Sequence, residues 1–97
     1  MKTEPRLEPP DQLPDRKLIA ETILGMVQTR GAGKSICPSE VARHLFPQGW
    51  RGWMEVVRQE AGKLQRERKI CITQKGQEVR LEDTRGAIRL SSPPPTH

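Results

Sequence analysis

Three patterns in the sequence use residue types that can do chemistry, and the first of them is Gly33-Lys34-Ser35. The same three residues close the phosphate-binding loop GxxxxGKS, whose backbone amides and lysine hold nucleotide phosphates. The first glycine of that loop would have to stand at position 28, which is Gln28. The segment also follows a predicted helix, whereas the loop would follow a strand. We therefore interpret this segment as a turn that ends a helix.

The second pattern is a set of metal-ligand residue types, which are Cys37, His44, Cys71 and His97. Their spacing matches neither a zinc knuckle nor a zinc finger, so we expect no metal and no other cofactor. The two cysteines are expected to be reduced and structural, and His44 to be exposed on a helix. Catalysis would need a nucleophile, a base or paired carboxylates in a pocket, and the sequence offers no such arrangement. We therefore expect that the chain is not an enzyme.

The third pattern is a concentration of cationic side chains in the middle of the chain. The net charge is +5, and residues 30–75 contain ten Lys and Arg against four Asp and Glu. This excess favours a polyanionic partner such as DNA, although a solvated basic surface would carry the same residues. The side chains that we expect to contact DNA are Arg43, Arg51, Arg58, Gln59, Lys63, Arg66 and Lys75.

Helices must position most of these side chains. The first helix is predicted to begin at its N-cap Asp15 and to end at Gly31 and Gly33. Its apolar residues recur at helical spacing, and they are Ile19, Ile23, Met26 and Val27.

A short strand at residues 35–37 and a second helix are predicted next. Pro38 suits the first turn of that helix, and Pro47 and Gly49 stop it. The residues on its apolar face are Val41, Ala42 and Leu45.

The third helix is the longest predicted element, from about Trp50 to about Arg68. One stripe of this helix is expected to face the core, and it consists of Trp50, Met54, Val57, Ala61, Leu64 and Arg68, with Trp53 at its edge. The opposite face is polar, and it carries Gly52, Glu55, Gln59, Lys63 and Arg66.

A β-hairpin is predicted after the third helix. Residues 69–74 and 77–81 alternate apolar and polar side chains, and the turn Lys75-Gly76 joins them. The last apolar segment, residues 86–90, is able to pair with this sheet or to pack on it.

The order helix, short strand, helix, helix and hairpin predicts an α+β fold. It is the order of a winged helix-turn-helix, with three helices and a small β-hairpin as its wing. We assign residues 15–91 to this domain, residues 1–14 to a disordered N-terminal arm and residues 92–97 to a disordered tail. No signal peptide and no membrane span are predicted, so we expect a cytoplasmic protein.

Four strings of residues between Leu18 and Leu90 form a recognisable combination. They are Ile36-Cys37-Pro38-Ser39-Glu40-Val41-Ala42-Arg43, then Trp50-Arg51 with Met54 and Val57-Arg58, then Ile72-Thr73-Gln74-Lys75-Gly76, and Arg85-Gly86 before Ile88-Arg89. Together they resemble the bacterial family known as domain of unknown function 3253. The resemblance implies a stand-alone winged-helix domain with no assigned activity, sometimes fused to a small cysteine-rich module that is absent from this sequence. Ala87 stands where the family pattern has Pro, and Gly52-Trp53 departs from the usual residues before Met54.

These expectations combine into a hypothesis of DNA binding, as a transcriptional regulator or an accessory protein. The helix at 50–68 would lie in the major groove of double-stranded DNA, and the wing would lie on the backbone. Arg51 and Gln59 would be able to reach base edges. For Arg58, an ion pair with Glu40 or Glu55 competes with a phosphate contact.

A second function remains open, which is a non-catalytic adaptor that binds another protein. An exposed apolar patch around Val56, Trp53 and Phe46 would favour it. We interpret Trp50 and Trp53 as packing against the first helix, with stacking on nucleic-acid bases as the alternative.

Overall fold

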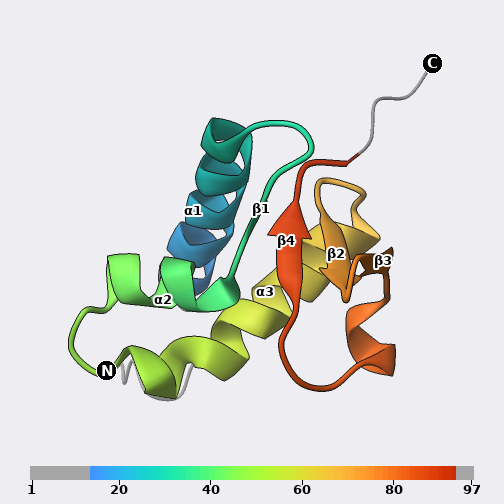
Figure 1. Cartoon of the computed structure of the whole chain (residues 1–97). Helices are drawn as coiled ribbons and strands as arrows, with labels where there is room; N and C mark the ends of the chain where they lie inside the picture. Colours follow the sequence, from blue (N-terminus) through green and yellow to red (C-terminus); the bar gives the residue numbers. More distant parts are fainter. Residues whose placement is uncertain (1–13, 94–97) are drawn as a thin grey trace, which may run out of the picture.

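The computed structural model describes residues 14–93, which form an α+β fold of three α-helices and a four-stranded antiparallel sheet (Figure 1). The arm predicted for residues 1–14 and the tail predicted for residues 92–97 lie outside this range, apart from Pro14, Ser92 and Pro93. Pro14 opens the first helix one residue before the predicted cap. No helix within residues 14–93 is long and apolar enough to cross a membrane.

The first helix, α1 (Pro14–Arg30), buries the apolar side that its spacing predicts. Gly31 ends the helix in a left-handed conformation, with φ at 99°, and donates its N–H to the Val27 carbonyl at 3.2 Å. The Gly33-Lys34 turn then leads into the strand β1 (Ser35–Ile36), as predicted. The buried residues of α1 are Ile19, Ile23 and Val27, whereas Met26 is only partly buried.

The second helix, α2 (Pro38–Leu45), begins at the proline that the sequence indicated. Pro38 needs no amide donor in the first turn, and Cys37 caps the helix in an extended conformation. The Cys37 N–H donates to Glu40 Oε2 at 2.9 Å, and Arg30 Nη2 donates to Glu40 Oε1 at 2.6 Å. The hydrogen bond from Cys37 lowers the pKa of Glu40 below its usual value of 4.5, partial burial opposes this shift, and Arg30 lowers the pKa further.

The third helix differs from its prediction at both ends. Residues Trp50–Trp53 form a 3₁₀ turn, η3, and the α-helix α3 runs only over Met54–Arg66. Gly52 lies inside η3, where its low α-helix propensity is consistent with a start in 3₁₀ conformation. At the other end Arg68 is left-handed, with φ at 65°, and the Lys69 N–H donates to the Leu64 carbonyl at 2.9 Å. This C-terminal cap places Arg68 outside the helix and in solvent, so its predicted position on the core stripe is wrong.

The core side of α3 is otherwise as predicted. Val57, Ala61 and Leu64 are buried, while Met54 and the two tryptophans pack against them and are half-buried. Gly62 is also buried, because Leu81 lies over it, and a Cβ atom there would come within 2.6 Å of Leu81 Cδ2.

The predicted hairpin is present but shorter than expected. It consists of β2 (Cys71–Gln74) and β3 (Gln77–Glu78), joined by Lys75 and Gly76 with φ at 54° and 81°. Two positive φ values are typical of the tight turns that match the twist of antiparallel strands. Val79 lies beyond β3, and Leu81 begins the short 3₁₀ helix η4 (Leu81–Asp83).

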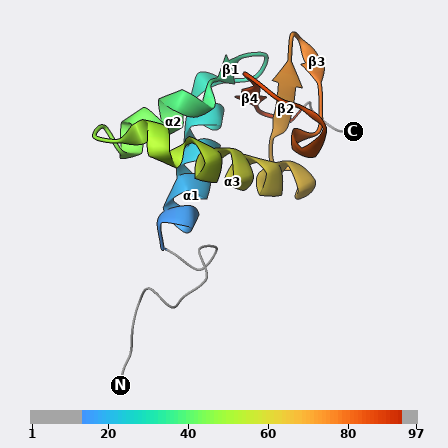
Figure 2. The ribbon, with the colours of Figure 1, turned by 90° about the horizontal axis from the view of Figure 1, so that it is seen from below.

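The last strand, β4 (Arg89–Ser91), lies inside the sheet, whose order is β1-β4-β2-β3. Leu90 is opposite Ile36 of β1 and also opposite Ile72 of β2, and all three side chains are buried. Seen from below in Figure 2, α3 crosses the molecule, with α2 towards one end and the β2–β3 hairpin towards the other. The core therefore lies between the helices and the apolar face of this small sheet.

Leu64→Ala should lower the free energy of unfolding by about 2–5 kcal/mol, because Leu64 is 5% exposed and its removal leaves a cavity. Leu18→Ala is the matched control, since Leu18 is 45% exposed. It should change stability by no more than about 0.5 kcal/mol. Denaturant unfolding measures both variants, and equal losses would show that the helix packs differently.

Glu40→Gln should cost about 1 kcal/mol near neutral pH, because it weakens the cap of α2. A lowered folded-state pKa means that the carboxylate stabilises the fold above the pKa of the unfolded chain, and that this contribution disappears as the pH falls through the folded-state pKa. The stability difference between wild type and Glu40→Gln should therefore shrink as the pH falls below about 4.5, the ordinary pKa of Glu, and vanish once the pH is below the folded-state pKa of Glu40. Thermal unfolding at several pH values measures it, and a difference that persists in acid would contradict the assignment.

Candidate nucleic-acid interface

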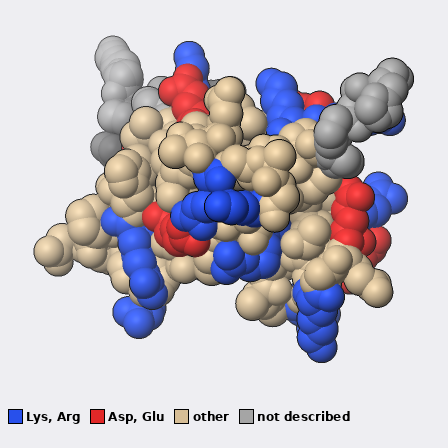
Figure 3. Space-filling view, turned by 45° about the horizontal axis from the view of Figure 1, so that its top comes forward, with Lys and Arg blue, Asp and Glu red and all other residues tan. Residues whose placement is uncertain are grey.

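Carboxylates neutralise five of the cations in residues 14–93. The ion pairs are Arg16–Glu60, Arg30–Glu40, Lys63–Glu60, Lys69–Glu67 and Arg80–Glu82. In the view of Figure 3, Lys and Arg side chains lie among acidic ones and do not form one continuous field. Any site for a polyanion therefore depends on local groups of cations that have no carboxylate beside them.

One such group lies at the hairpin. A hollow of about 500 Å³ is lined by Gln74, Lys75, Arg85, Gly86, Ala87 and Arg89, and we call it the hairpin hollow. Three of these six residues are cationic and none is acidic. No carboxylate of residues 14–93 forms an ion pair with these three cations. The hollow is therefore mainly cationic, and one of its cations, Arg89, also lies close enough to Glu40 to lower the pKa of that carboxyl.

Hydrogen bonds from two other elements fasten the loop that forms this hollow. Gln74 Nε2 of β2 donates to the Arg85 carbonyl at 2.6 Å and to the Ala87 carbonyl at 3.2 Å. Arg89 is held from the other side, because its Nε donates to Ser35 Oγ at 2.9 Å. These bonds hold the backbone of the loop and the side chain of Arg89. A cation that is already held in place loses less side-chain entropy when an anion binds.

Arg58 makes a contact that the sequence did not suggest. Its Nη1 donates to the Gly86 carbonyl at 2.9 Å, so it joins α3 to the loop of the hairpin hollow. It forms no ion pair with Glu40, which pairs with Arg30, or with Glu55. Arg58 is half-buried at the border of the core, where the backbone of this distant loop lies.

A second group of cations surrounds Trp50 at the start of the third helix. The Arg43 guanidinium carbon lies 4.3 Å from the centroid of the Trp50 ring, and that of Arg51 lies 4.5 Å from it. Beside them, Phe46 and Trp53 are stacked with their ring centroids 4.0 Å apart. Both tryptophans pack on the core, but η3 lies mainly beside α2 and α3, whereas packing against α1 was predicted. Trp50 also contacts two cations, which the sequence analysis did not foresee.

The polar face of α3 is partly occupied by α1. Gln59, predicted to read bases, accepts a hydrogen bond from Arg16 at 2.7 Å and donates one to Glu55 at 3.3 Å. Lys63, predicted to contact phosphates, lies 3.5 Å from Glu60. Arg66, the third DNA-contacting residue predicted on this face, is exposed and forms no ion pair among residues 14–93.

Glu60 and Arg16 form a buried ion pair that the sequence analysis missed. Glu60 is 3% exposed and its Oε2 lies 2.7 Å from Arg16 Nη1. The Arg16 side chain is 12% exposed, and its Nε is buried with no hydrogen-bond partner among the described residues. Glu60 lies three residues after Val57 and four residues before Leu64, so it borders the side of the helix that faces the core. This spacing was the sequence signal that could have predicted the burial of Glu60.

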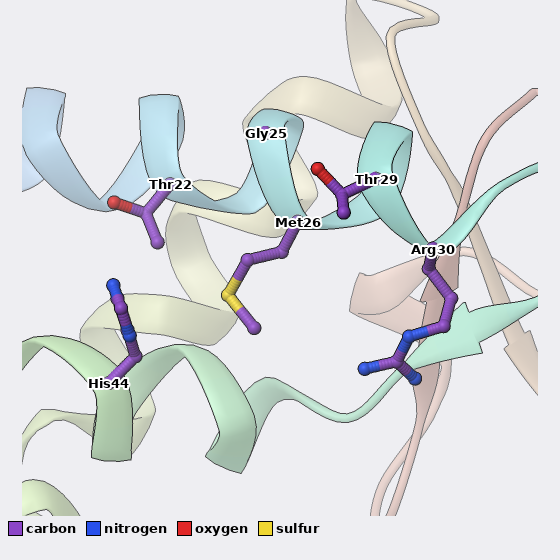
Figure 4. A pocket seen from close by; sticks show the side chains of 6 residues that line it. All are labelled: Thr22, Gly25, Met26, Thr29, Arg30 and His44. Carbon is purple, nitrogen blue, oxygen red and sulfur yellow. The ribbon is translucent and has the colours of Figure 1, made fainter.

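Two further hollows have no feature of a catalytic site. The first, of about 430 Å³, lies between α1 and α2, where Figure 4 shows Met26 between Thr22, His44 and Arg30. Its cation, Arg30, is already paired, and His44 is exposed as expected.

The second hollow contains Cys71, and burial raises the pKa of this thiol above its usual value of 9.0, with Glu78 adding to the shift. A protonated thiol is a poor nucleophile. Both cysteines are free, as expected.

Arg16→Met should lower the free energy of unfolding by about 2–4 kcal/mol, because it leaves the buried Glu60 carboxylate with Lys63 alone. The double variant Arg16→Met/Glu60→Gln should recover part of this loss, since no buried charge remains without its partner. Denaturant unfolding of the two single variants and the double variant gives the coupling energy. Strictly additive losses would show that the pair does not stabilise the fold.

Comparison with known proteins assigns the chain to a family. A search of curated proteins found no matching relative. The model of the family described as "Protein of unknown function (DUF3253)" matches residues 16–93, which is most of the chain and almost all of the described fold. The predicted resemblance is thus confirmed, and the chain belongs to this family of proteins of unknown function.

Proposed function

We propose that this chain is a winged helix-turn-helix domain that binds double-stranded DNA. In this arrangement α2 and α3 are the two helices of the motif, α3 enters the major groove, and the β2–β3 hairpin with the loop after it is the wing. The order of the elements supports the assignment, as does the position of the hairpin towards one end of α3 (Figure 2).

The hairpin hollow is the observation that carries this proposal. Lys75, Arg85 and Arg89 line one concavity of about 500 Å³ that has no acidic residue in its wall. A phosphate group of a DNA backbone would bring to this place the negative charge that the protein itself does not supply. Lysine and arginine bind phosphate by charge-assisted hydrogen bonds, and their long side chains suit a wing that lies beside the duplex.

With the structure, we revise the set of residues that we propose to contact DNA. Lys75, Arg43 and Arg51 stay as phosphate-contacting residues, and Arg85 and Arg89 join them. Arg66 stays as a candidate on the exposed part of α3. Arg58 is a positioning residue for the wing, because it binds the Gly86 carbonyl. Gln59 and Lys63 already have partners in the protein, so they reach DNA only by exchanging them.

The alternative of a protein-binding adaptor receives no support from an exposed apolar patch. Within residues 14–93, Leu18 is the one large hydrophobic side chain that is exposed. The three residues proposed for such a patch, Phe46, Trp53 and Val56, are half-buried against the core. DNA binding therefore remains the function that the charges and the geometry favour.

A titration of a labelled DNA duplex at several salt concentrations tests the proposal. With about five cations on phosphates, log K should fall with log salt at a slope of about −4 to −5. Lys75→Gln and Arg85→Gln should each weaken binding on every sequence and flatten the slope by about one unit, because each removes one phosphate contact.

Lys69→Gln is the matched control for these two variants. It removes the same charge from an exposed lysine, but Lys69 pairs with Glu67 and lies outside the hairpin hollow. Its salt slope should equal that of the wild type. Failure of the wild-type protein to bind duplex DNA more tightly than about 100 μM at low salt would overturn the proposed function.

A further inference from the structure

We infer that Arg43, Trp50 and Arg51 form a second phosphate clamp, in which the Trp50 ring prearranges two arginines for the DNA backbone. We call these three residues the Trp50 clamp. The inference rests on the proposed function, because it names a second point at which the same DNA duplex is held.

The geometry of the clamp leaves the hydrogen-bonding edges of both arginines available. Each guanidinium carbon lies within 4.5 Å of the Trp50 ring centroid, the distance of a cation–π contact. A guanidinium that stacks on a ring uses its flat face, so the N–H groups at its edge are left to bind another group. Neither Arg43 nor Arg51 has a hydrogen bond or an ion pair to another side chain among residues 14–93, and both are exposed.

The two charges of the clamp have no carboxylate in an ion pair with them among residues 14–93. Both cations lie beside one ring, so their guanidinium carbons are at most about 9 Å apart and repel each other. The ring quadrupole attracts each cation but does not neutralise it. An anion between or beside the two guanidinium edges would remove the repulsion, and a phosphate diester accepts hydrogen bonds from both.

The surroundings of Trp50 hold the ring in one place. Gly49, with φ at 83°, turns the chain from α2 into η3, and Trp50 packs against the core from the start of η3. The stacked rings of Phe46 and Trp53, with an interplanar angle of 7°, fill the same turn. The tryptophan is therefore a fixed platform, and the two arginines take their positions from it.

The clamp and the hairpin hollow lie at two separate points along the third helix. The clamp lies at its start, and Arg58, which binds the loop of the hairpin hollow, comes eight residues later. Eight residues of helix rise by about 12–14 Å. The two groups of cations therefore provide two separate anchor points for the DNA backbone beside the same helix.

Replacement of the ring tests whether Trp50 organises the arginines. Trp50→Phe keeps an aromatic face and Trp50→Leu keeps an apolar side chain without one, so the two variants differ mainly in the cation–π contact. At fixed salt, Trp50→Leu should weaken binding of a labelled DNA duplex about three- to tenfold, and Trp50→Phe about twofold or less. Thermal unfolding of both variants shows whether each one keeps the fold.

Variants of the arginines test the phosphate contact itself and do not depend on the tolerance of the core. The double variant Arg43→Gln/Arg51→Gln should flatten the salt slope by about two units, because two phosphate contacts are lost. Arg68→Gln is the matched control, since Arg68 is an exposed arginine beyond the other end of α3. It should leave the slope unchanged.

The possible outcomes separate this inference from the proposed function. Binding of DNA by the wild type, together with an unchanged slope in Arg43→Gln/Arg51→Gln, overturns the clamp and leaves the function standing. Equal affinities of Trp50→Leu and the wild type overturn the role of the ring. Absence of DNA binding by the wild type overturns the function and the clamp together. Flattening in the arginine variant, with a loss in Trp50→Leu that exceeds the loss in Trp50→Phe, supports the inference.

Discussion

The pairing of β4 with two strands at once is the interaction on which the rest of the structure depends. Leu90 lies opposite Ile36 and Ile72, so one buried side chain joins the strand after α1 to the strand after α3. Without β4, β1 would have no partner in the sheet, because the strand order is β1-β4-β2-β3. To reach this pairing, the chain runs back from the hairpin to β4, and Arg85 and Arg89 on this segment come to lie beside Lys75. The strand that closes the core therefore also assembles the hairpin hollow.

Ion pairs within the protein decide which of the many cations remain available to a partner. Glu60 forms ion pairs with Arg16 and Lys63, and Glu40 forms one with Arg30. Much of the positive charge near α1 is therefore neutralised by ion pairs that hold the helices together. Burial strengthens the first of these pairs and also makes it costly to break, because a charge left without its partner in the core is poorly solvated. Among the cations without an ion pair, Lys75, Arg85 and Arg89 gather in the hairpin hollow, and Arg43 and Arg51 gather at Trp50. These two groups are the local concentrations of charge to which our proposal assigns the contacts with a polyanion.

The two groups hold their cations by different physical means. In the hairpin hollow, hydrogen bonds from Gln74 and Arg58 to backbone carbonyls fix the loop. The cationic side chains of this loop therefore extend from fixed backbone positions. At the start of the third helix an aromatic ring attracts the guanidinium groups directly. Both arrangements reduce the side-chain entropy that is lost when an anion binds. This shared property is the physical basis for assigning both groups to one DNA duplex.

The sequence by itself determined the local elements, because they follow from interactions between near neighbours in the chain. Helical spacing of Ile19, Ile23 and Val27, the proline at position 38 and the Lys75-Gly76 turn predicted α1, α2 and the hairpin, and residues quoted from the sequence also indicated the family. The tertiary structure decided which side chains meet across the fold. Arg58 binds the carbonyl of Gly86, twenty-eight residues away, and Arg16 binds Glu60, forty-four residues away. An angle on a helical wheel shows that a residue borders the core, but it does not show which distant segment lies there. That information arises only when β4 enters the sheet and α1 packs across α3, since these long-range contacts are set by how the whole apolar surface is buried.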